Sequence, residues 1–217
     1  MDVLVVAHRA GNSLSGLAAA PLLGADAVEL DVHSYRGRLE VRHLKTAGPL
    51  PFLWDRWELR AASEPRLELG DVLGATPPGV TLMLDLKGPR TSIGTATSRL
   101  LREQGWDRPL LACGRRWSAV DALAAEQAHV RPVLSVRNRL ELGLLLRRLD
   151  TAPAPYGVSM HGSLLSTPLI ARLHRDVERV LTWPVNDLQA LDRVLTHGVT
   201  GVISDEPATL REALAQL

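Results

Sequence analysis

The chain has 217 residues, of which 46% are hydrophobic and 23% charged, and its formal net charge at pH 7 is +1. This length and composition predict one globular domain over residues 1–217 with a substantial core. A net charge so near zero gives no electrostatic field for nucleic acid, and the single cysteine, Cys113, excludes an internal disulfide framework.

The amino-terminal sequence runs from Met1-Asp2 straight into the apolar stretch 3–6. It has no basic leader and no long apolar run, so neither a signal peptide nor a membrane-spanning segment is expected. We therefore expect a cytoplasmic protein without stable membrane insertion. The sequence leaves the oligomeric state open.

Short β-branched runs alternate with longer Leu/Ala-rich segments along the chain. Strands are expected at 3–7, 26–32, 80–86, 109–113, 131–136, 156–160, 179–182 and 200–204, and helices at 13–23, 91–104, 117–128, 138–149, 166–176, 187–196 and 207–216. Regular alternation calls for a parallel sheet, and eight such units in 217 residues favour a lean α/β (β/α)₈ TIM barrel. No GxGxxG motif follows the first strand. The absence of this motif makes the alternative, an open, doubly wound nucleotide-binding sheet, less well supported.

The second expected strand carries two acidic residues. Side chains alternate along a strand, so Glu29 and Asp31 share one face while the apolar residues between them share the other. Two carboxylates this close, in a partly desolvated place, raise at least one pKa or attract a cation. From this stretch alone, a buried ion pair with arginine and a metal or catalytic site are equally supported.

The stretch 33–79 interrupts the alternation of strands and helices. Gly37 is typical of a tight turn, and the extended run 38–42 that follows it predicts a hairpin with the strand 26–32. This hairpin would deliver His43 to the end of the strand that carries the two carboxylates.

A segment rich in proline and tryptophan follows the hairpin. We expect residues 44–67, with Trp54 and Trp57, to form a small irregular insertion over the barrel mouth. A helix near 67–75 and the Pro-Pro-Gly turn at 77–79 then lead into the third barrel strand.

The carboxyl ends of barrel strands are where loops build a site. Polar and aromatic side chains gather at these ends or just beyond them: His8, Arg9, Glu29, Asp31, His43, Asp85, Lys87, Ser159, His161, Trp183, Asn186, Ser204 and Asp205. Packing gives barrel strands no reason to end in charge, so this convergence favours a functional site.

The acidic residues at this rim are typical of a site for a hard cation. Glu29, Asp31 and Asp85 offer oxygen ligands that suit Mg²⁺ or Ca²⁺ better than zinc, and the choice between the two stays open. Beside such a cation, Arg9 and Lys87 would form a positive pocket that suits a phosphate oxygen.

Two histidines complete the predicted chemistry. Histidine is the side chain that ordinarily changes charge near neutral pH, so of His8 and His43 one can take a proton from an attacking hydroxyl and the other can return one to a leaving group. Together with a divalent cation and a phosphate pocket, they predict metal-assisted phosphodiester cleavage.

The chain carries short motifs in a fixed order: His8-Arg9, Glu29-Leu30-Asp31-Val32, His43, Asp85-Leu86-Lys87, 182–186 and 198–207. In this order they resemble the motifs of the bacterial glycerophosphodiester phosphodiesterases, a family of phospholipase-C-like barrels. The family motifs are His-Arg-Gly, Glu-Leu-Asp-Val, a second His, Glu-Ile-Lys, Trp-Thr-Val-Asn and a closing Gly-Val-Asp-Gly-Ile-Ile-Thr-Asp-x-Pro. The resemblance spans nearly the whole chain, and the ordered set is highly specific.

The resemblance implies hydrolysis of small-molecule glycerophosphodiesters to sn-glycerol 3-phosphate and an alcohol such as choline or ethanolamine. A glycerol hydroxyl would attack first, and water would then open the cyclic phosphate. The resemblance implies that Glu29, Asp31 and Asp85 are the ligands of a divalent cation, Mg²⁺ or Ca²⁺. It implies that His8 and His43 are the acid–base pair. The implied substrate- or phosphate-binding residues are Arg9, Lys87, Trp183 and Asn186.

The chain departs from the family pattern near the site. The loop after Arg9 is short and keeps only Asn12 of the family's Pro-Glu-Asn-Thr stretch. Leu44 stands where the family has an aspartate after the second histidine, and Asp85 replaces a glutamate. These changes bear on substrate class and metal affinity more than on the fold.

Other functions stay open. Lys87 at a strand end would suit a Schiff-base aldolase, and Leu44 makes a barrel that binds a phosphorylated ligand without turnover conceivable. Among phosphodiesterases, lysophospholipase D-type cleavage of lysophospholipids is the nearest rival, because Trp54 and Trp57 would form an apolar lip over the mouth.

Overall fold

The computed structural model describes residues 3–47, 50–55 and 58–216. Within these residues the barrel strands are β1 (Leu4–Ala7), β2 (Ala27–Tyr35), β8 (Thr81–Lys87), β9 (Leu110–Gly114), β10 (Val130–Val136), β11 (Gly157–His161), β12 (Arg179–Trp183) and β13 (Gly201–Ser204). They run parallel in the order β1-β13-β12-β11-β10-β9-β8-β2, and pairing of β1 with β2 closes the ring. The predicted (β/α)₈ barrel is confirmed.

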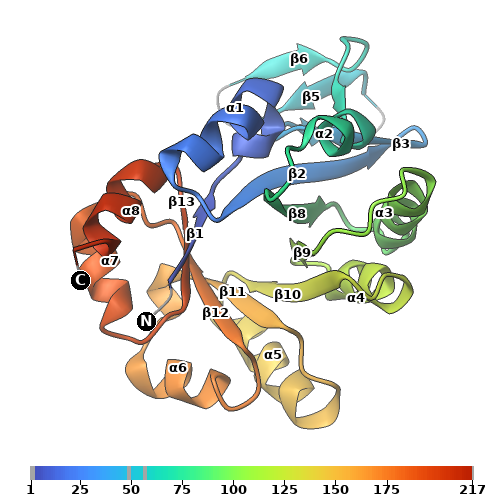
Figure 1. Cartoon of the computed structure of the whole chain (residues 1–217). Helices are drawn as coiled ribbons and strands as arrows, with labels where there is room; N and C mark the ends of the chain where they lie inside the picture. The colour runs from blue at the N-terminus through green and yellow to red at the C-terminus, as the bar shows by residue number, and fades with distance from the viewer. Residues whose placement is uncertain (1–2, 48–49, 56–57, 217) are drawn as a thin grey trace.

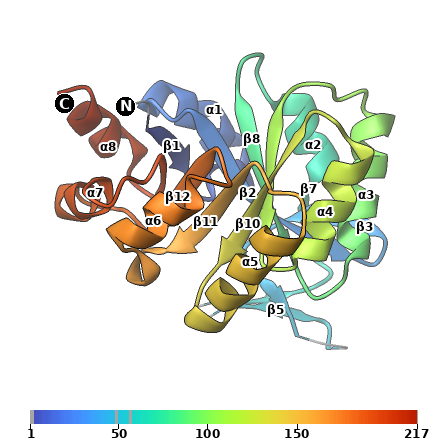
Figure 2. The ribbon, with the colours of Figure 1, turned by 90° about the horizontal axis from the view of Figure 1, so that it is seen from below.

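Helices surround the ring of strands on its outside (Figures 1 and 2). They are α1 (Leu14–Ala19), α2 (Leu69–Ala75), α3 (Ser92–Glu103), α4 (Trp117–Glu126), α5 (Arg139–Thr151), α6 (Thr167–Leu173), α7 (Leu188–Leu195) and α8 (Pro207–Leu214). In the described part of the chain, no helix is long and apolar enough to cross a membrane. The sequence predicts one helix over 13–23, but α1 ends at Ala19 and the 3₁₀ helix η2 (Ala20–Leu23) follows it. The α-helix ends there because Pro21 has no amide hydrogen to donate to a helical hydrogen bond.

The barrel interior changes from apolar to polar towards the carboxyl ends of the strands. One buried cluster holds the inward-facing apolar side chains: Val6, Ala27, Met83, Leu111, Cys113, Val133, Leu181 and Ile203. Two residues further along β2 and β8, the same face carries Glu29 and Asp85. The opposite face of β2, including Leu30, packs in the main core. Strand alternation therefore places charge inside the mouth and leaves the outer core apolar.

The predicted hairpin after β2 is present. β3 (Arg38–Val41) runs antiparallel to the end of β2, with Val41 opposite Val32. Arg36 and Gly37 make the turn with φ values of 48° and 82°, the left-handed conformation that two-residue hairpin loops require. The backbone N–H of Arg42 then donates a hydrogen bond to the carbonyl of Asp31, which brings His43 to the mouth.

The sequence predicts an irregular insertion after the hairpin. This prediction is wrong, because the insertion forms a small antiparallel sheet. Its strands are β4 (Lys45–Thr46), β5 (Phe52–Trp54) and β6 (Leu59–Ala61). Strands of two or three residues are too short to display a two-residue period, so the sequence pattern does not reveal them. The chain then returns through β7 (Leu67–Glu68), which pairs with β3 and takes the first two residues of the helix predicted near 67–75.

We predict a stability difference between two helical glycines. A Cβ atom at Gly94 in α3 would overlap the carbonyl oxygen of Ala119 in α4, whereas one at Gly143 in α5 meets nothing within 4 Å. Gly94→Ala should therefore destabilise the protein by about 1–3 kcal/mol through overpacking. Gly143→Ala should stabilise it by up to about 1 kcal/mol through helix propensity. Urea unfolding followed by circular dichroism measures both; equal effects would contradict the close contact between α3 and α4.

Candidate active site

Three acidic side chains meet inside the mouth. The parallel register of β2 and β8 sets Asp31 directly opposite Asp85, and Glu29 lies two residues before Asp31 on the same face. Carboxylate oxygens of all three lie within 4.8 Å of one another. Glu29 and Asp31 are buried, with 3% and 0% of their surfaces exposed. Clustered hard oxygen donors of this kind can hold a divalent metal ion.

The cation that lies closest to these carboxylates is a lysine. Lys87 Nζ lies 2.7 Å from Asp31 Oδ1 and also forms an ion pair with Asp85 Oδ2. Arg9 Nε is further away, at 3.7 Å from Asp31 Oδ2, and its side chain is 42% exposed. The arginine ion pair considered from the sequence is therefore a minor contact. Within the described part of the chain, only one positive group is in close contact with the three carboxyl groups, so a divalent cation bound among them would offset their mutual repulsion.

Burial and neighbouring charges shift the pKa values of this cluster in opposite directions. Burial, with the charges of Asp31 and Asp85, raises the pKa of Glu29 well above its usual value. Burial also acts to raise the pKa of Asp31, but His43 and Lys87 outweigh it and hold this pKa below its usual value. Burial alone would lower the pKa of Lys87, yet the adjacent carboxylates raise it, so the ammonium stays charged.

The loop after β1 holds two of the carboxylates in place. Arg9 has a φ of 54°, a left-handed conformation that costs a non-glycine residue about 1–2 kcal/mol. In this conformation its N–H donates a 2.7 Å hydrogen bond to Glu29 Oε2. Asn12 donates to Asp31 Oδ2 at 2.9 Å and accepts from the Asp31 N–H at 2.8 Å. A Cβ atom at Gly11 would lie 2.9 Å from Leu30 Cβ, so the short loop packs tightly against β2.

The two candidate acid–base histidines contact different carboxylates. His8 Nδ1 lies 2.7 Å from Asp205 Oδ1, and His43 Nδ1 lies 3.4 Å from Asp31 Oδ2. With Nδ1 engaged, Nε2 is the nitrogen that each imidazole retains for proton transfer. The chain has Leu44 in place of the aspartate that follows the second histidine in the family motif. Asp31 provides a carboxylate for His43 instead.

The sequence had assigned no role to Asp205. β1 pairs with β13 so that Ala7 lies opposite Ser204, and the residues that follow each, His8 and Asp205, become neighbours. The position of Asp205 in the closing motif, 198–207, was the one feature of the sequence that could have indicated a role at the site. Asn186 does not join the carboxylate cluster; its Nδ2 donates to Asp205 Oδ2 at 2.8 Å and so fixes the partner of His8.

A buried ion pair holds the backbone on both sides of His43. The Arg42 guanidinium, only 5% exposed, bonds Glu40 Oε2 at 2.7 Å. It also donates to the Leu44 carbonyl and, at 3.1 Å, to Thr46 Oγ1. Because a buried charge must be paired and hydrogen-bonded, this network limits the positions that His43 can take.

The remaining aromatic candidates lie around the mouth. Trp183 is half-buried on the interior cluster, and its ring meets the His161 ring edge-on at 5.1 Å between centroids. Trp54 is exposed on the small sheet, and Trp57 lies outside the described residues. Cys113 is buried, and burial raises the pKa of its thiol.

Comparisons with known proteins give matches in structure but not in sequence. No protein-family model and no curated protein sequence matches the chain. A structure from Silicibacter pomeroyi DSS-3, described as a candidate glycerophosphoryl diester phosphodiesterase, superposes with a TM-score of 0.82 at 17% identity, over 99% of this chain and 94% of that one.

Two further solved structures are similar. An Oleispira antarctica phosphodiesterase in complex with its product sn-glycerol-3-phosphate gives a TM-score of 0.75 at 20% identity, over 98% of this chain and 96% of that one. A glycerophosphodiester phosphodiesterase from Thermotoga maritima gives 0.73 at 16% identity, over 98% of this chain and 99% of that one. The chain therefore has the barrel fold of solved glycerophosphodiester phosphodiesterases, the family that its motifs resemble.

Proposed function

We propose that the protein is a metal-dependent glycerophosphodiester phosphodiesterase, which releases sn-glycerol 3-phosphate and an alcohol. The observation that carries this proposal is the meeting of three carboxylates, Lys87 and two imidazoles at one barrel mouth. The similar fold of a phosphodiesterase that holds sn-glycerol-3-phosphate supports the same reaction.

Glu29, Asp31 and Asp85 are the residues that would hold the cation. Bound there, a divalent cation supplies Lewis-acid stabilisation of charge on the phosphoryl oxygens. Lys87 and Arg9 add positive charge on the same side and orient the phosphate. Because Lys87 already bonds two of the carboxylates, its ammonium is fixed before substrate arrives.

The histidines move the protons. In the first step, one imidazole takes the proton of a glycerol hydroxyl as its oxygen bonds to phosphorus, and the other protonates the departing alcohol. In the second step the roles reverse, and water opens the cyclic phosphate. Asp205 orients His8 and Asp31 orients His43, so that Nε2 of each ring is available to the reacting groups.

The contacts at the mouth weigh against the other classes of function. A Schiff-base lysine must be unprotonated, whereas carboxylates raise the pKa of Lys87. Binding without turnover gives no reason for two imidazoles that each contact a carboxylate. Lysophospholipase D-type cleavage remains a second candidate, favoured by the exposed Phe52 and Trp54 on the small sheet that follows His43.

His8→Ala should lower kcat for hydrolysis of glycerophosphocholine by about 100-fold or more, because it removes an acid–base group. His8 is partly exposed, so the unfolding midpoint should barely change. His197→Ala is the matched control, since this histidine follows α7 at the opposite end of the barrel and contacts Thr167. Near-normal turnover by His8→Ala would remove this histidine from the mechanism.

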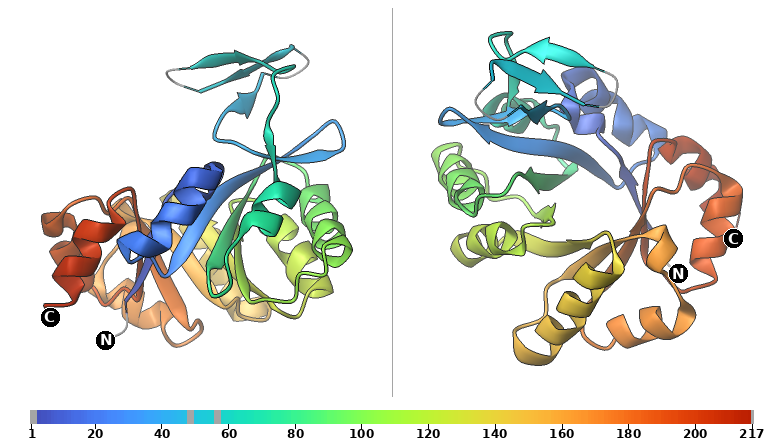
Figure 3. Two further views of the ribbon diagram at one scale, coloured as in Figure 1. Left: turned by 45° about the horizontal axis from the view of Figure 1, so that its top comes forward. Right: turned by 180° about the vertical axis from the view of Figure 1, so that it is seen from behind.

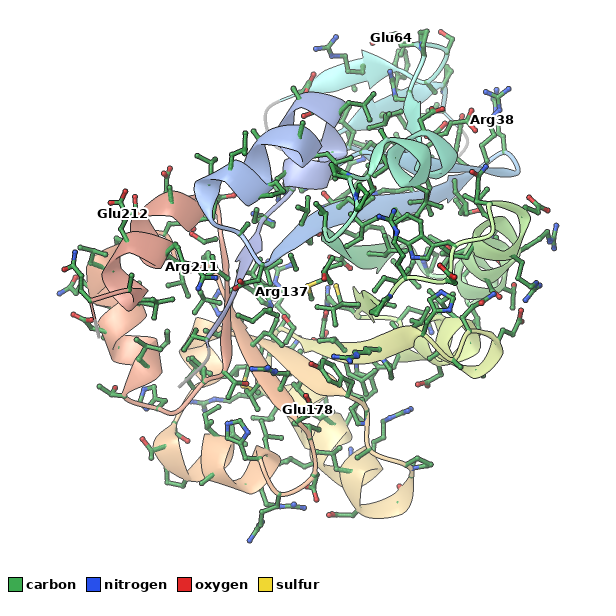
Figure 4. The ribbon with its side chains drawn as sticks, viewed as in Figure 1. Arg38, Glu64, Arg137, Glu178, Arg211 and Glu212 are labelled. Atoms are coloured by element: carbon green, nitrogen blue, oxygen red, sulfur yellow. The ribbon has the colours of Figure 1, made fainter. Side chains whose placement is uncertain are left out.

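Glu29→Gln should weaken binding of Mg²⁺ or Ca²⁺ by at least about tenfold, because it removes a charged ligand. Isothermal titration calorimetry on the full chain measures this affinity without any substrate. Glu212→Gln, on the exposed face of α8 (Figure 4), is the control and should bind as the wild type does. An unchanged affinity in Glu29→Gln would mean that the cation binds elsewhere.

Lys87→Arg should lower kcat by about 10–100-fold although the charge is kept, because a guanidinium fork cannot replace a compact ammonium between two carboxylates. Lys45 is the only other lysine of the chain, and Lys45→Arg on the small sheet is the control. Glycerophosphocholine hydrolysis by both variants gives the answer. If Lys87→Arg is as active as Lys45→Arg, Lys87 is a structural residue.

A further inference from the structure

One face of the small sheet is apolar and exposed. Its antiparallel register pairs Lys45 with Trp54 and Trp54 with Leu59, and directly opposed residues point to the same side. Phe52, two residues before Trp54 in β5, shares that side. We call these four residues, Lys45, Phe52, Trp54 and Leu59, the insertion face. It contains the only phenylalanine of the chain.

The other side of the sheet turns towards the protein. Leu53, between the two aromatic residues of β5, is 1% exposed, and Thr46 receives the hydrogen bond from the buried Arg42. The insertion face is therefore directed away from these contacts. Phe52, Trp54 and Leu59 expose 42%, 43% and 67% of their surfaces. Leu50, just before β5, adds 57%.

The size of this face argues against a protein partner. A stable protein interface buries about 1,200–2,000 Å² and takes about 20–30 residues from each side. Among the described residues of the insertion, 44–47, 50–55 and 58–67, the face offers four side chains on strands of two or three residues. A lipid surface requires neither a minimum area nor shape complementarity, and a few aromatic and leucine side chains are enough to enter it.

The chemistry of the face matches a phospholipid surface. Tryptophan prefers the level of the head groups, and a lysine beside it can keep its ammonium among phosphates while its stem lies on apolar groups. Lys45 has this arrangement, with Nζ 5.4 Å from the centre of the Trp54 ring. Arg60 lies opposite Leu53 in the register, so it points to the other side of the sheet, where it pairs with Glu58. Lys45 is therefore the cation of the insertion face.

The insertion face also lies close to the candidate site along the chain. β4 begins two residues after His43, and the sheet stands apart from the barrel on that side (Figure 3, left). A surface that the insertion face enters would thus bring head-group phosphates near the mouth.

We infer that the insertion face docks the protein on phospholipid surfaces, so that its phosphodiester substrates include molecules presented by a lipid interface. The inference about substrates rests on the proposed function; the docking itself does not. A lysophospholipid is a glycerophosphodiester that carries one acyl chain, and the same hydrolysis at phosphorus releases its head-group alcohol.

Sedimentation of the full chain with vesicles tests the docking. Vesicles of phosphatidylcholine with added phosphatidylglycerol should bind the wild type, and pure phosphatidylcholine should bind it more weakly, because Lys45 meets fewer anionic groups there. The double variant Phe52→Ser, Trp54→Ser should lose at least about tenfold in partitioning. It should still hydrolyse glycerophosphocholine at the wild-type rate, which also shows that it folds.

Two controls test whether the insertion face itself is responsible for vesicle binding. Leu140→Ser, Leu144→Ser removes two exposed leucines from α5 and should leave vesicle binding unchanged. His8→Ala should also bind vesicles normally, so failure of the proposed function and failure of the docking give different results. Absence of wild-type binding, or an equal loss in the α5 variant, would overturn the inference. Self-association that disappears in the Phe52, Trp54 variant would assign the face to a second copy of the chain instead.

Discussion

Repulsion between buried carboxylates is the constraint on which the rest of the site depends. Glu29 and Asp31 lie on one face of β2 and are almost completely buried, and β8 brings Asp85 to the same place. Uncompensated, such charges would cost several kcal/mol. The surrounding groups offset this cost. The Lys87 ammonium forms an ion pair with these carboxylates, and the Arg9 backbone N–H and the Asn12 side chain donate hydrogen bonds to them. Most polar contacts at the mouth therefore exist because β2 carries charge inward.

The two histidines are held in unequal environments. Asp205, which contacts His8, is half exposed and bonds neither the carboxylate cluster nor Lys87. Asp31, which contacts His43, is fully buried and also bonds Lys87 and Asn12. His43 therefore contacts the carboxylate cluster itself, whereas His8 contacts a carboxylate outside the cluster.

The sequence predicts those features that depend on local periodicity or on short motifs. The eight barrel strands, the hairpin and the facing of Glu29 and Asp31 follow from two-residue alternation and turn residues. The pairing of His8 with Asp205 depends on closure between the first and last strands, which no local pattern encodes. The role of Arg42 was equally hidden, because a basic residue next to a rim position is read as solvent-exposed until its burial is known.

The insertion leaves and rejoins the barrel at a single place. The chain departs after Val41 of β3 and returns at Leu67 of β7, which lies directly opposite Val41. Because the two ends are adjacent, loop-closure entropy changes only slowly with the number of residues between them. Evolution can therefore lengthen, shorten or exchange this segment as a cassette while the strands that carry the carboxylates stay as they are.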